Sequence, residues 1–566
     1  MNNAESPGPR PRGIRRLLRR GSLRKDALAG LVLGVESVPD GLASGLLAGV
    51  NPVAGLYAYL FGMAGAAFFT SSSFMAVQAT GAMALIVNDT DLASRPDPER
   101  ALFTLAMLTG VVMLLAGLLG GGRLLRFVPT AVMTGFVTAV GVNIVLGQLG
   151  DLTGAEGYGA NRLTRAIDLV LHVSRFDIPT LIVGVLTMVL IPLLTRTPLR
   201  SLGLVVAVAV GSVVAWLMNG SGFDVAVVAD IAEIPAALPM PTLPVLEDVW
   251  FLIIPAMSLA FVGIVQGAAV SAGVPNTDGR PADTNRDFVG QGVGNLVSGL
   301  FQGMPVGGSM SASALYVAAG ARTRLGLIMA SSVMAITVLF ASGIVSQVAM
   351  PSLAALLIVI GIGTIKPAQI QSVANTGVLQ ITVMGVTFLL TLIVPLQFAV
   401  LVGVGLGIIL FVAEQSNQLR LRQIHFEDDG RRRESSPAAT VGAHEVVVVQ
   451  PYGSLFFANA PNLEAQLPRV DAATRGSVVI LRLRGIDQIG LSHVEVLRRY
   501  ATELDQAGSR LEVIVTSDRV RSNLTAGGLT AIIGEAAVHR GTEWQGDTLR
   551  TVYANALDRV GGQADE

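Results

Sequence analysis

Two acidic residues, Glu36 and Asp40, stand four positions apart in the first long apolar segment of the chain. This spacing places both carboxylates on one face of a helix, which Pro39 is expected to kink. An ionisable side chain inside an apolar span is costly to bury, so it indicates a functional site. Two carboxylates within one turn repel each other, and we expect one of them to take up a proton readily. The alternative is that Glu36 lies near the end of the segment and faces water.

A second set of candidate residues lies in the glycine-rich stretch from Gly299 to Arg324, GLFQGMPVGGSMSASALYVAAGARTR. The apolar pattern breaks at glycines and a proline and restarts at residues 309–311, too close to Arg322 for a full span of roughly 20 residues. Such a half-length helix is tolerated at membrane depth only where its backbone lines a cavity. Its N-terminal N–H groups would then suit an anion. The alternative is a helix–loop–helix whose glycines serve close packing.

The first half of the chain contains a similar short segment, in which three serines at 71–73 are followed by FMAVQATGAMALIV. Each short segment is the third apolar segment of its half, and seven segments in each half give the two halves opposite topology. This arrangement is typical of inverted-repeat transporters, in which short interrupted helices mark a binding site near the membrane midplane. The halves share little sequence, so this prediction rests on position.

The composition indicates an integral membrane protein. The 566 residues are 51% hydrophobic and 14% charged, whereas soluble proteins carry about 25% charged residues. The net charge of −1 gives no field that would attract nucleic acid. The chain has no cysteine, and its five histidines show no metal-ligand spacing. We find no P-loop, dinucleotide-binding motif or catalytic triad, so we expect no enzyme, no cofactor and no dedicated metal site.

The apolar segments predict fourteen membrane spans between residues 26 and 414. Basic residues fall in alternate loops and acidic residues in the others; since positive loops stay cytoplasmic, both termini are expected in the cytoplasm. The basic segment 1–25 is expected on the cytoplasmic face, as an interfacial helix or a disordered arm. The predicted apolar segments are 27–49, 52–70, 74–87, 101–120, 127–149, 166–195, 203–219, 250–272, 288–302, 308–319, 325–342, 351–365, 377–394 and 396–413.

Beyond residue 414 the pattern becomes that of a soluble domain. Residues 415–440 are polar and are interpreted as a solvated linker, and residues 441–566 form a small α/β domain with a C-terminal tail. The expected strands are 445–450, 454–459, 477–484 and 511–517. The expected helices are 463–467, 492–507 and 518–526.

Several motifs give the chain a resemblance to a known family, from residue 26 to about 555. They are DALAGLVLG, LLAGVNPVAGLYA and NRDFVGQGVGNLVSGLFQGMPVGGSMS followed by AGART. The chain resembles the SulP family of anion transporters, in which a membrane domain precedes a STAS domain. The resemblance implies two seven-span repeats, divided into a core and a gate domain, elevator-like transport and a homodimer. It places the anion site at Val77, Gln78, Ala79, Thr80, Gly308, Ser309, Met310 and Ser311.

This sequence departs from the family at three positions near that site. Ala312 stands where many members have arginine, Gln266 where many have an acid, and Asp40 follows Pro39 where glutamine is frequent. The resemblance places Asp40 next to the anion site, where its negative charge would repel an anion until it is protonated. We therefore favour proton-coupled symport. The alternative is that Asp40, Gln266 and Ser309 bind sodium through their oxygens.

In the STAS region, residues 486–490, IDQIG, lack the hydroxyl that phosphorylated relatives carry, so we expect a structural or partner-binding role. Taken together, the sequence predicts a multi-pass transporter of the cell (cytoplasmic) membrane for a small inorganic or carboxylate anion. Sulfate, a dicarboxylate and bicarbonate are the candidate substrates. The competing hypotheses are a sodium-coupled bicarbonate symporter and a membrane-anchored STAS regulatory protein or sensor.

Overall fold

A computed structural model describes most of the chain: residues 20–122, 129–197, 202–274, 276, 281–396, 419–427, 431–544 and 546–564, with short pieces between 398 and 413. The chain divides into two compact units between Gly407 and Ile408. We call the first the helical unit and the second the sheet unit. The predicted basic segment 1–25 lies largely outside the described residues.

The helical unit is built from helices, and every predicted apolar segment before residue 395 contains at least part of one. The last predicted segment, 396–413, lies largely outside the described residues. The helices are α1 (Arg20–Leu47), α2 (Pro52–Tyr57), the π-helical turn η2 (Ala58–Gly62), α3 (Met63–Phe69), α4 (Gly81–Asp89), α5 (Pro98–Leu118), α6 (Thr130–Gly147), α7 (Leu149–Thr153), α8 (Arg162–Leu171), α9 (Ile178–Leu194), α10 (Gly203–Gly220), α11 (Val249–Gly273), α12 (Thr284–Leu300), α13 (Met310–Ala318), α14 (Leu325–Val345), α15 (Met350–Thr364), α16 (Pro367–Ala374) and α17 (Val378–Ile393).

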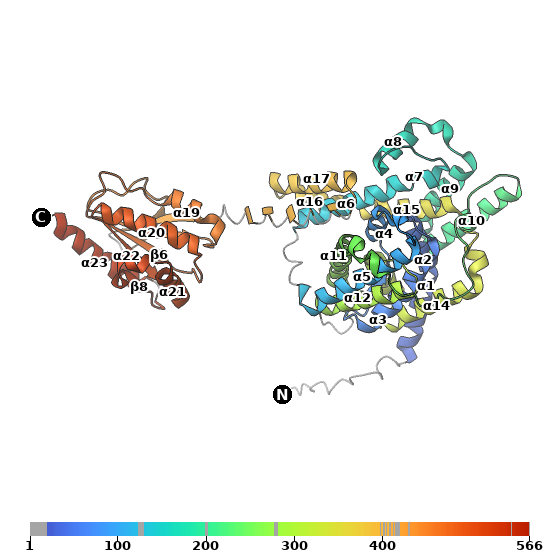
Figure 1. Cartoon of the computed structure of the whole chain (residues 1–566), viewed down its shortest axis with the longest axis horizontal. Helices are drawn as coiled ribbons and strands as arrows, with labels where there is room; N and C mark the ends of the chain where they lie inside the picture. The colour runs from blue at the N-terminus through green and yellow to red at the C-terminus, as the bar shows by residue number, and fades with distance from the viewer. Residues whose placement is uncertain are drawn as a thin grey trace, which may run out of the picture. The chain divides into compact units, whose positions relative to one another are not determined.

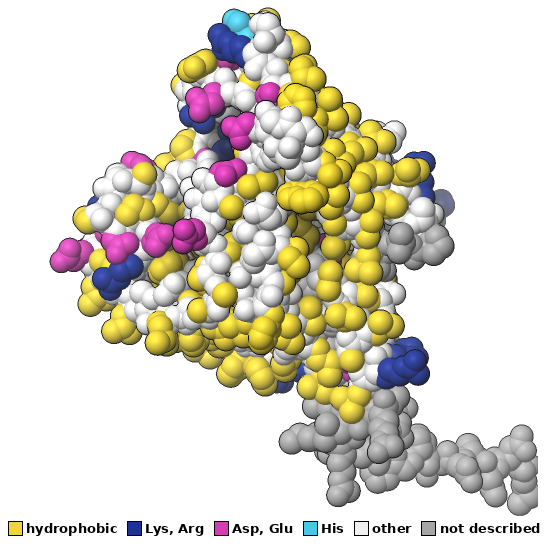
Figure 2. All heavy atoms as spheres, turned by 90° about the vertical axis from the view of Figure 1, so that its right-hand side faces the viewer, with side chains coloured by type: hydrophobic (Ala, Val, Ile, Leu, Met, Phe, Trp, Pro, Cys, Tyr) yellow, Lys and Arg dark blue, Asp and Glu magenta, His cyan; other side chains and the backbone are white. Residues whose placement is uncertain are grey.

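Within the described residues, eight helical stretches are long and apolar enough to cross a membrane. They are 23–47, 52–69, 98–118, 130–153, 203–220, 246–272, 325–345 and 350–374, and the apolar helices α9 and α17 are shorter. Large apolar side chains such as Trp216 on α10 and Phe340 on α14 are exposed. Figure 2 shows hydrophobic side chains spread over one face of the molecule. An apolar exterior of this extent fits contact with lipid rather than with water.

Helix packing divides the helical unit into two bundles. In the first bundle α5 packs on α11 and α12, α12 on α3, and α1 on α2 and α14. In the second bundle α6 packs on α15 and α17, and α9 on α10 and α15. Figure 1 shows α6, α7, α9 and α15 above the helices of the first bundle. Each bundle combines segments from both halves of the chain, as the predicted inverted repeats require.

Glycine pairs hold the helices of each bundle close together. A Cβ atom on Gly110 of α5 would lie 2.6 Å from the carbonyl oxygen of Gly292 on α12, in the first bundle. A Cβ atom on Gly141 of α6 would lie 2.7 Å from the carbonyl oxygen of Gly361 on α15, in the second. Backbones can approach this closely only when the side chain is a hydrogen atom, as is common between membrane helices.

The sheet unit contains a six-stranded sheet with the order β4-β3-β5-β6-β7-β8. Strands β5 to β8 run parallel, and β3 and β4 add two antiparallel strands at one edge. The strands are β3 (Arg420–Phe426), β4 (Arg432–Ser435), β5 (Val446–Tyr452), β6 (Val478–Leu483), β7 (Arg510–Val515) and β8 (Val538–Arg540). The helices are α19 (Ala460–Gln466), α20 (Leu491–Gln506), α21 (Asp518–Ala526), α22 (Leu529–Ile533) and α23 (Asp547–Ala564).

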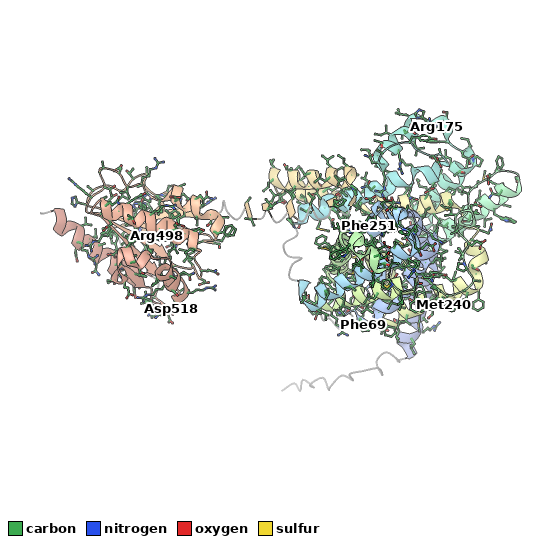
Figure 3. All side chains as sticks on the ribbon, viewed as in Figure 1. Phe69, Arg175, Met240, Phe251, Arg498 and Asp518 are labelled. Atoms are coloured by element: carbon green, nitrogen blue, oxygen red, sulfur yellow. The ribbon has the colours of Figure 1, made fainter. Side chains whose placement is uncertain are left out.

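Alternating strand residues bury both faces of this sheet. Val447 and Val449 of β5 pack in one cluster with residues of α19 to α22, such as Leu497 of α20. Val448, between them, packs in a second cluster with α23 residues such as Val552. Figure 3 labels Arg498 on α20 and Asp518 at the start of α21. A parallel sheet covered on both faces is the expected α/β arrangement.

Two expectations for this unit differ from the structure. Residues 454–459 were expected to form a strand, but Leu455 makes only an isolated bridge to Ile489, and Phe457–Asn459 is a turn of 3-10 helix. The segment 415–440 was expected to be a solvated linker, yet it contains β3 and β4. Leu421 and Ile424 of β3 are buried in the clusters on opposite faces of the sheet. Arg420, Arg422 and His425 stand beside them in the sequence, so the composition of the segment is polar overall.

Buried His493, in the first turn of α20, should make the sheet unit sensitive to acid. Asn459 donates its amide to Ser454, so its oxygen accepts the Nε2 proton of His493 at 2.6 Å, and Nδ1 has no partner. Burial lowers the pKa of His493 to about 4, against about 6.5 in an unfolded chain. The unfolded chain therefore binds an extra proton between these values. Stability should fall as the pH drops from about 6.5 towards 4, by up to about 1.4 kcal/mol per pH unit.

Hydrogen exchange of the β5 to β7 amides in the full-length protein, compared at pH 7 and pH 5 after correction for intrinsic rates, measures this effect. His493→Gln keeps a donor for Asn459 but cannot be protonated, so its exchange should lose most of the pH dependence. An equal loss of protection at pH 5 in both proteins would place the acid-sensitive group elsewhere.

Candidate functional site

Two short strands bring together the two segments that the sequence predicts as a binding site. Strand β1 (Ala76–Gln78) pairs antiparallel with β2 (Gly307–Ser309), and Val77 lies opposite Gly308. All the residues of both strands are buried. The short helix α4 begins shortly after β1, and α13 begins directly after β2. The N-termini of two half-length helices therefore converge on one strand pair, although they are more than 200 residues apart in the sequence.

Each short helix is capped by the hydroxyl side chain that precedes it. The Thr80 hydroxyl accepts from the Met83 N–H at 3.5 Å, and the Ser309 hydroxyl accepts from the Ala312 N–H at 3.3 Å. Such N-caps satisfy one of the backbone donors that a helix leaves unpaired at its start. The predicted site residues Met310 and Ser311 form the first turn of α13, and both are exposed.

Side chains of α12 satisfy the backbone that leads into β2. Asn295 donates its amide to the Val306 carbonyl at 2.6 Å and accepts from the Val306 N–H at 2.8 Å. Gln291 accepts the Gly308 N–H at 3.0 Å. Both side chains are fully buried. The Gly308 N–H is thus already occupied, so Gly308 can contribute to a ligand site through its shape but not through this donor.

Glycines allow α11 to lie directly against β2. A Cβ atom on Gly308 would stand 2.6 Å from the Cα atom of Gly267, and one on Gly307 would stand 3.0 Å from the Cα atom of Gly263. Gln266 lies between these two α11 glycines in the sequence. Its Oε1 accepts the Thr80 hydroxyl hydrogen at 2.8 Å. Of the sequence-predicted residues, Gln266 and Thr80 are therefore in direct contact.

The other predicted donor, Gln78, points towards α1. Its side chain is fully buried and donates to the Ser37 hydroxyl at 2.7 Å, while its Oε1 has no partner. The Gln78 amide hydrogen that bonds to Ser37 and the Thr80 hydroxyl hydrogen that bonds to Gln266 are therefore both used by acceptors within the protein. A ligand at this place would meet the remaining backbone and amide donors of the helix termini instead.

The acid pair of α1 lies beside the same strands. Asp40 Oδ2 accepts a hydrogen bond from the Tyr59 hydroxyl at 2.7 Å. That hydroxyl also lies 2.9 Å from the Ala79 carbonyl oxygen and 3.0 Å from the Ser44 hydroxyl. Tyr59 therefore links Asp40 to the residue between β1 and the cap of α4. The structure confirms that Asp40 is close to the predicted segment 77–80.

Glu36 is buried, with 9% of its surface exposed, and its Oε2 has no hydrogen-bond partner, whereas Asp40 is half-buried. The alternative in which Glu36 faces water is therefore wrong, because α1 continues from Arg20 to Leu47 and places Glu36 well inside the unit. Of the predicted sodium ligands, Gln266 Oε1 is engaged by Thr80, and the Ser309 hydroxyl lies 3.2 Å from the Ser311 hydroxyl. Among the described residues, no three Asp, Glu or His side chains form a metal-binding group.

Two buried aspartates hold the loops at the ends of α3 and α13. Asp287 accepts the N–H groups of Ser71 and Ser72 at 2.7 and 3.0 Å. Asp26 accepts the N–H groups of Arg322 and Thr323 at 2.6 and 2.9 Å. Both carboxylates are completely shielded from solvent. Such charge-assisted bonds fix the loops on either side of the short helices.

Sequence reasoning missed Tyr59, Gln291, Asn295 and Asp287. Tyr59 stands in the apolar run GLYAYLFG, and the polar residues of α12 are embedded in the glycine-rich run QGVGN. Buried polar side chains in apolar surroundings need hydrogen-bond partners. A polar side chain inside a predicted span therefore indicates a buried hydrogen bond, and this signal could have identified the four residues.

Comparisons with known proteins agree with this architecture. The family described as "Sulfate permease family" matches residues 23–387, and the "STAS domain" model matches residues 438–543. The "Probable sulfate transporter MT1781" of Mycobacterium tuberculosis (strain CDC 1551 / Oshkosh) is 26% identical over 91% of this chain and 93% of its own length. "Bicarbonate transporter BicA" of Picosynechococcus sp. is 25% identical over 77% of this chain and 79% of its own length.

The chain also resembles a solved structure, that of the murine Solute Carrier 26 family member A9 anion transporter in the inward-facing state. The TM-score is 0.83 with 20% sequence identity, and the match covers 96% of this chain and 93% of that one. The likeness at this level of identity concerns the fold, and it extends over both units.

We predict that Gly308→Ala destabilises the helical unit, because the added methyl group would overlap the backbone of Gly267 and force β2 away from α11. Overpacking of this kind costs about 1–3 kcal/mol. The measurement is the thermal unfolding midpoint of the purified protein in detergent. Gly343→Ala is the matched control, since a Cβ atom at Gly343 on α14 would meet no atom within 4 Å. Equal midpoints for the two variants would contradict the close approach.

Proposed function

We propose proton-coupled anion symport for this chain, which belongs to the sulfate permease family and is therefore a multi-pass membrane anion transporter with a C-terminal STAS domain rather than an enzyme. The anion binds between the N-termini of α4 and α13, and Asp40 is the proton carrier. The observation that carries the proposal is the contact of Asp40, through Tyr59, with Ala79 at the start of α4.

The charges at the site support coupling to a proton. The described strand pair and the first turns of α4 and α13 contain no lysine or arginine, and Ala312 stands where a basic residue would follow Ser311. The available donors are neutral N–H and amide groups, whereas Asp40 and Glu36 are acids. An ionised Asp40 repels an anion, and a protonated Asp40 does not. Proton and anion therefore favour each other's binding by the same factor.

The substrate in this proposal is a small oxyanion or carboxylate: sulfate, a dicarboxylate or bicarbonate. Two relatives named as a probable sulfate transporter and a bicarbonate transporter support the first and the last of these. Two helix N-termini offer several N–H donors to the oxygens of such an anion.

Sodium-coupled bicarbonate symport is the alternative, with Asp40, Gln266 and Ser309 as oxygen ligands for the cation. The similarity of this chain to a bicarbonate transporter supports this alternative. A membrane-anchored STAS sensor is the weaker alternative, since a sensor needs neither two opposed half-length helices nor an acid pair on a helix inside the unit. For the assembly, we propose fourteen spans in two inverted repeats, a homodimer in the cell membrane, and both termini in the cytoplasm.

Uptake into liposomes tests the coupling ion and the substrate. Labelled sulfate, succinate and bicarbonate are each supplied with an inward proton gradient or an inward sodium gradient. We expect accumulation of one anion with the proton gradient, and we expect Asp40→Asn to abolish the dependence on that gradient while the protein stays folded. Accumulation with sodium alone would support the cation-binding role of Asp40. Unchanged proton dependence in Asp40→Asn would contradict proton coupling through this residue.

An elevator-like movement would require the two bundles to slide past each other. A covalent cross-link at a contact between the bundles would prevent this movement. Arg162 of α8, in the second bundle, donates to Asn88 Oδ1 and pairs with Asp89 Oδ1, both at 2.6 Å, at the end of α4 in the first bundle. The natural chain contains no cysteine. Cross-linking of an N88C/R162C pair with a short bismaleimide should therefore abolish uptake of the transported anion.

The control pair lies within the first bundle. Arg100 of α5 donates to the Leu243 carbonyl in the loop before α11, at 3.3 Å, so a cross-linked R100C/L243C pair should retain uptake. The single variants N88C and R162C, treated with the same reagent, report on modification alone. Full uptake by the cross-linked N88C/R162C protein would exclude sliding of these bundles during transport.

A further inference from the structure

We propose that Tyr59 transmits the protonation state of Asp40 to the N-terminus of α4, so that protonation completes the anion site by rearranging a hydrogen bond as well as by removing a charge. This inference rests on the proton coupling proposed above. It assigns Tyr59 as a positioning residue, because its hydroxyl group acts on the site through Ala79.

The geometry gives one hydroxyl group three neighbours on two segments. Tyr59 is held in the π-helical turn η2 and is 1% exposed. Its oxygen lies 2.7 Å from Asp40 Oδ2, 2.9 Å from the Ala79 carbonyl oxygen and 3.0 Å from the Ser44 hydroxyl. Single π-helical turns occur frequently at functional sites.

The Tyr59 hydroxyl has one hydrogen, whereas an ionised Asp40 and the Ala79 carbonyl can only accept. When Asp40 is ionised, the hydrogen goes to the carboxylate, because hydrogen bonds to charged groups are the stronger ones. The buried Ala79 carbonyl then lacks this donor. When Asp40 is protonated, its own O–H donates to the Tyr59 oxygen, and the Tyr59 hydrogen is free to donate to Ala79. The proton comes from solvent and stays on Asp40, so Tyr59 gains and loses none.

The Ala79 carbonyl belongs to the peptide group that leads into Thr80, the cap of α4. Thr80 also donates to Gln266 on α11. A donor on the Ala79 carbonyl therefore fixes the peptide that orients the start of α4, and a missing donor leaves that peptide free to turn. The anion-binding N–H groups of α4 follow directly after this peptide.

The other titratable groups on elements that pack against α1 have partners elsewhere. Helices α10, α14 and α15 carry no charged or titratable side chain. The remaining groups on these elements bond as follows: Tyr57 to the Ala237 carbonyl, Tyr316 to the Thr323 carbonyl, and Asp89 to Arg162. On α1 itself, Asp26 accepts from the Thr323 N–H. Among the described residues, this leaves Glu36, on α1 itself, as the other acid that acts on Asp40.

A double-mutant cycle on the anion KM separates the relay from simple charge repulsion. The probe is whichever of labelled sulfate, succinate and bicarbonate the liposome assay identifies, at pH 7.5. Asp40→Asn has no charge and can donate to Tyr59, so it should lower the KM about fivefold or more, the effect of supplying a donor to a buried carbonyl. In the Y59F background, Asp40→Asn should change the KM much less, because no hydroxyl remains to turn towards Ala79.

The outcomes distinguish this inference from the function on which it rests. If Asp40→Asn lowers the KM equally in both backgrounds, charge alone couples proton and anion, and the relay is wrong while the symport stands. If Asp40→Asn leaves both the KM and the gradient dependence unchanged, the proposed coupling itself fails. Tyr57→Phe is the control, since the Tyr57 hydroxyl contacts Ala237 instead, and it should keep the behaviour of the unmodified protein.

A second measurement needs no Tyr59 variant and no ligand. Hydrogen exchange of residues 79–84, corrected for intrinsic rates, should slow in the unmodified protein as the pH falls from 8 to 5. In Asp40→Asn it should stay slow throughout this range. Exchange that is independent of pH in the unmodified protein, or pH-dependent to the same degree in Asp40→Asn, would overturn the relay.

Discussion

The helical unit depends on one constraint: backbone that leaves the helix inside an apolar environment must find hydrogen-bond partners. The chain is interrupted before α4 and again before α13, and the two interruptions solve the problem jointly by pairing as β1 and β2. Gln291 and Asn295 of α12 bond the neighbouring peptide groups. The glycines of α11 then allow a helix to lie directly on the strands. The site is therefore rigid because its backbone has few alternatives.

The same constraint decides which groups remain for a ligand. Many of the polar side chains near the strand pair are spent on protein partners, such as Thr80 on Gln266 and Gln78 on Ser37. What is left is a set of neutral donors at the helix N-termini, beside the half-buried carboxylate of Asp40. In the symport proposed above, the charge of the ligand is balanced by changing the charge of the protein. A carboxylate that accepts a proton is the simplest group on α1 that can do so.

The bonds within the first bundle also differ in burial from the ion pair between the two bundles. Asp26 and Asp287 tie the loops of the first bundle together with charge-assisted bonds that are shielded from solvent. The contacts between the bundles include the pairing of Arg162 with Asp89, where both side chains remain partly exposed. Buried networks of this kind are strong, whereas partly exposed ion pairs contribute little. The elevator-like movement proposed above would therefore break partly exposed contacts such as this pair and leave the buried bonds of the first bundle intact.

The sequence by itself determined the helical segments, the two short interrupted ones and the acids of α1, because length, hydrophobicity and glycine content are local properties. It placed β5, β6 and β7 for the same reason, and it missed β3, whose buried Leu421 and Ile424 are flanked by Arg420, Arg422 and His425. Only the tertiary structure decided that β1 pairs with β2, that Gln78 faces Ser37, and that Tyr59 stands between Asp40 and Ala79. Some of these contacts join residues that are more than 200 positions apart, such as Val77 and Gly308. Such contacts are fixed by which buried polar groups find each other when the helices pack, and local sequence patterns do not contain that information.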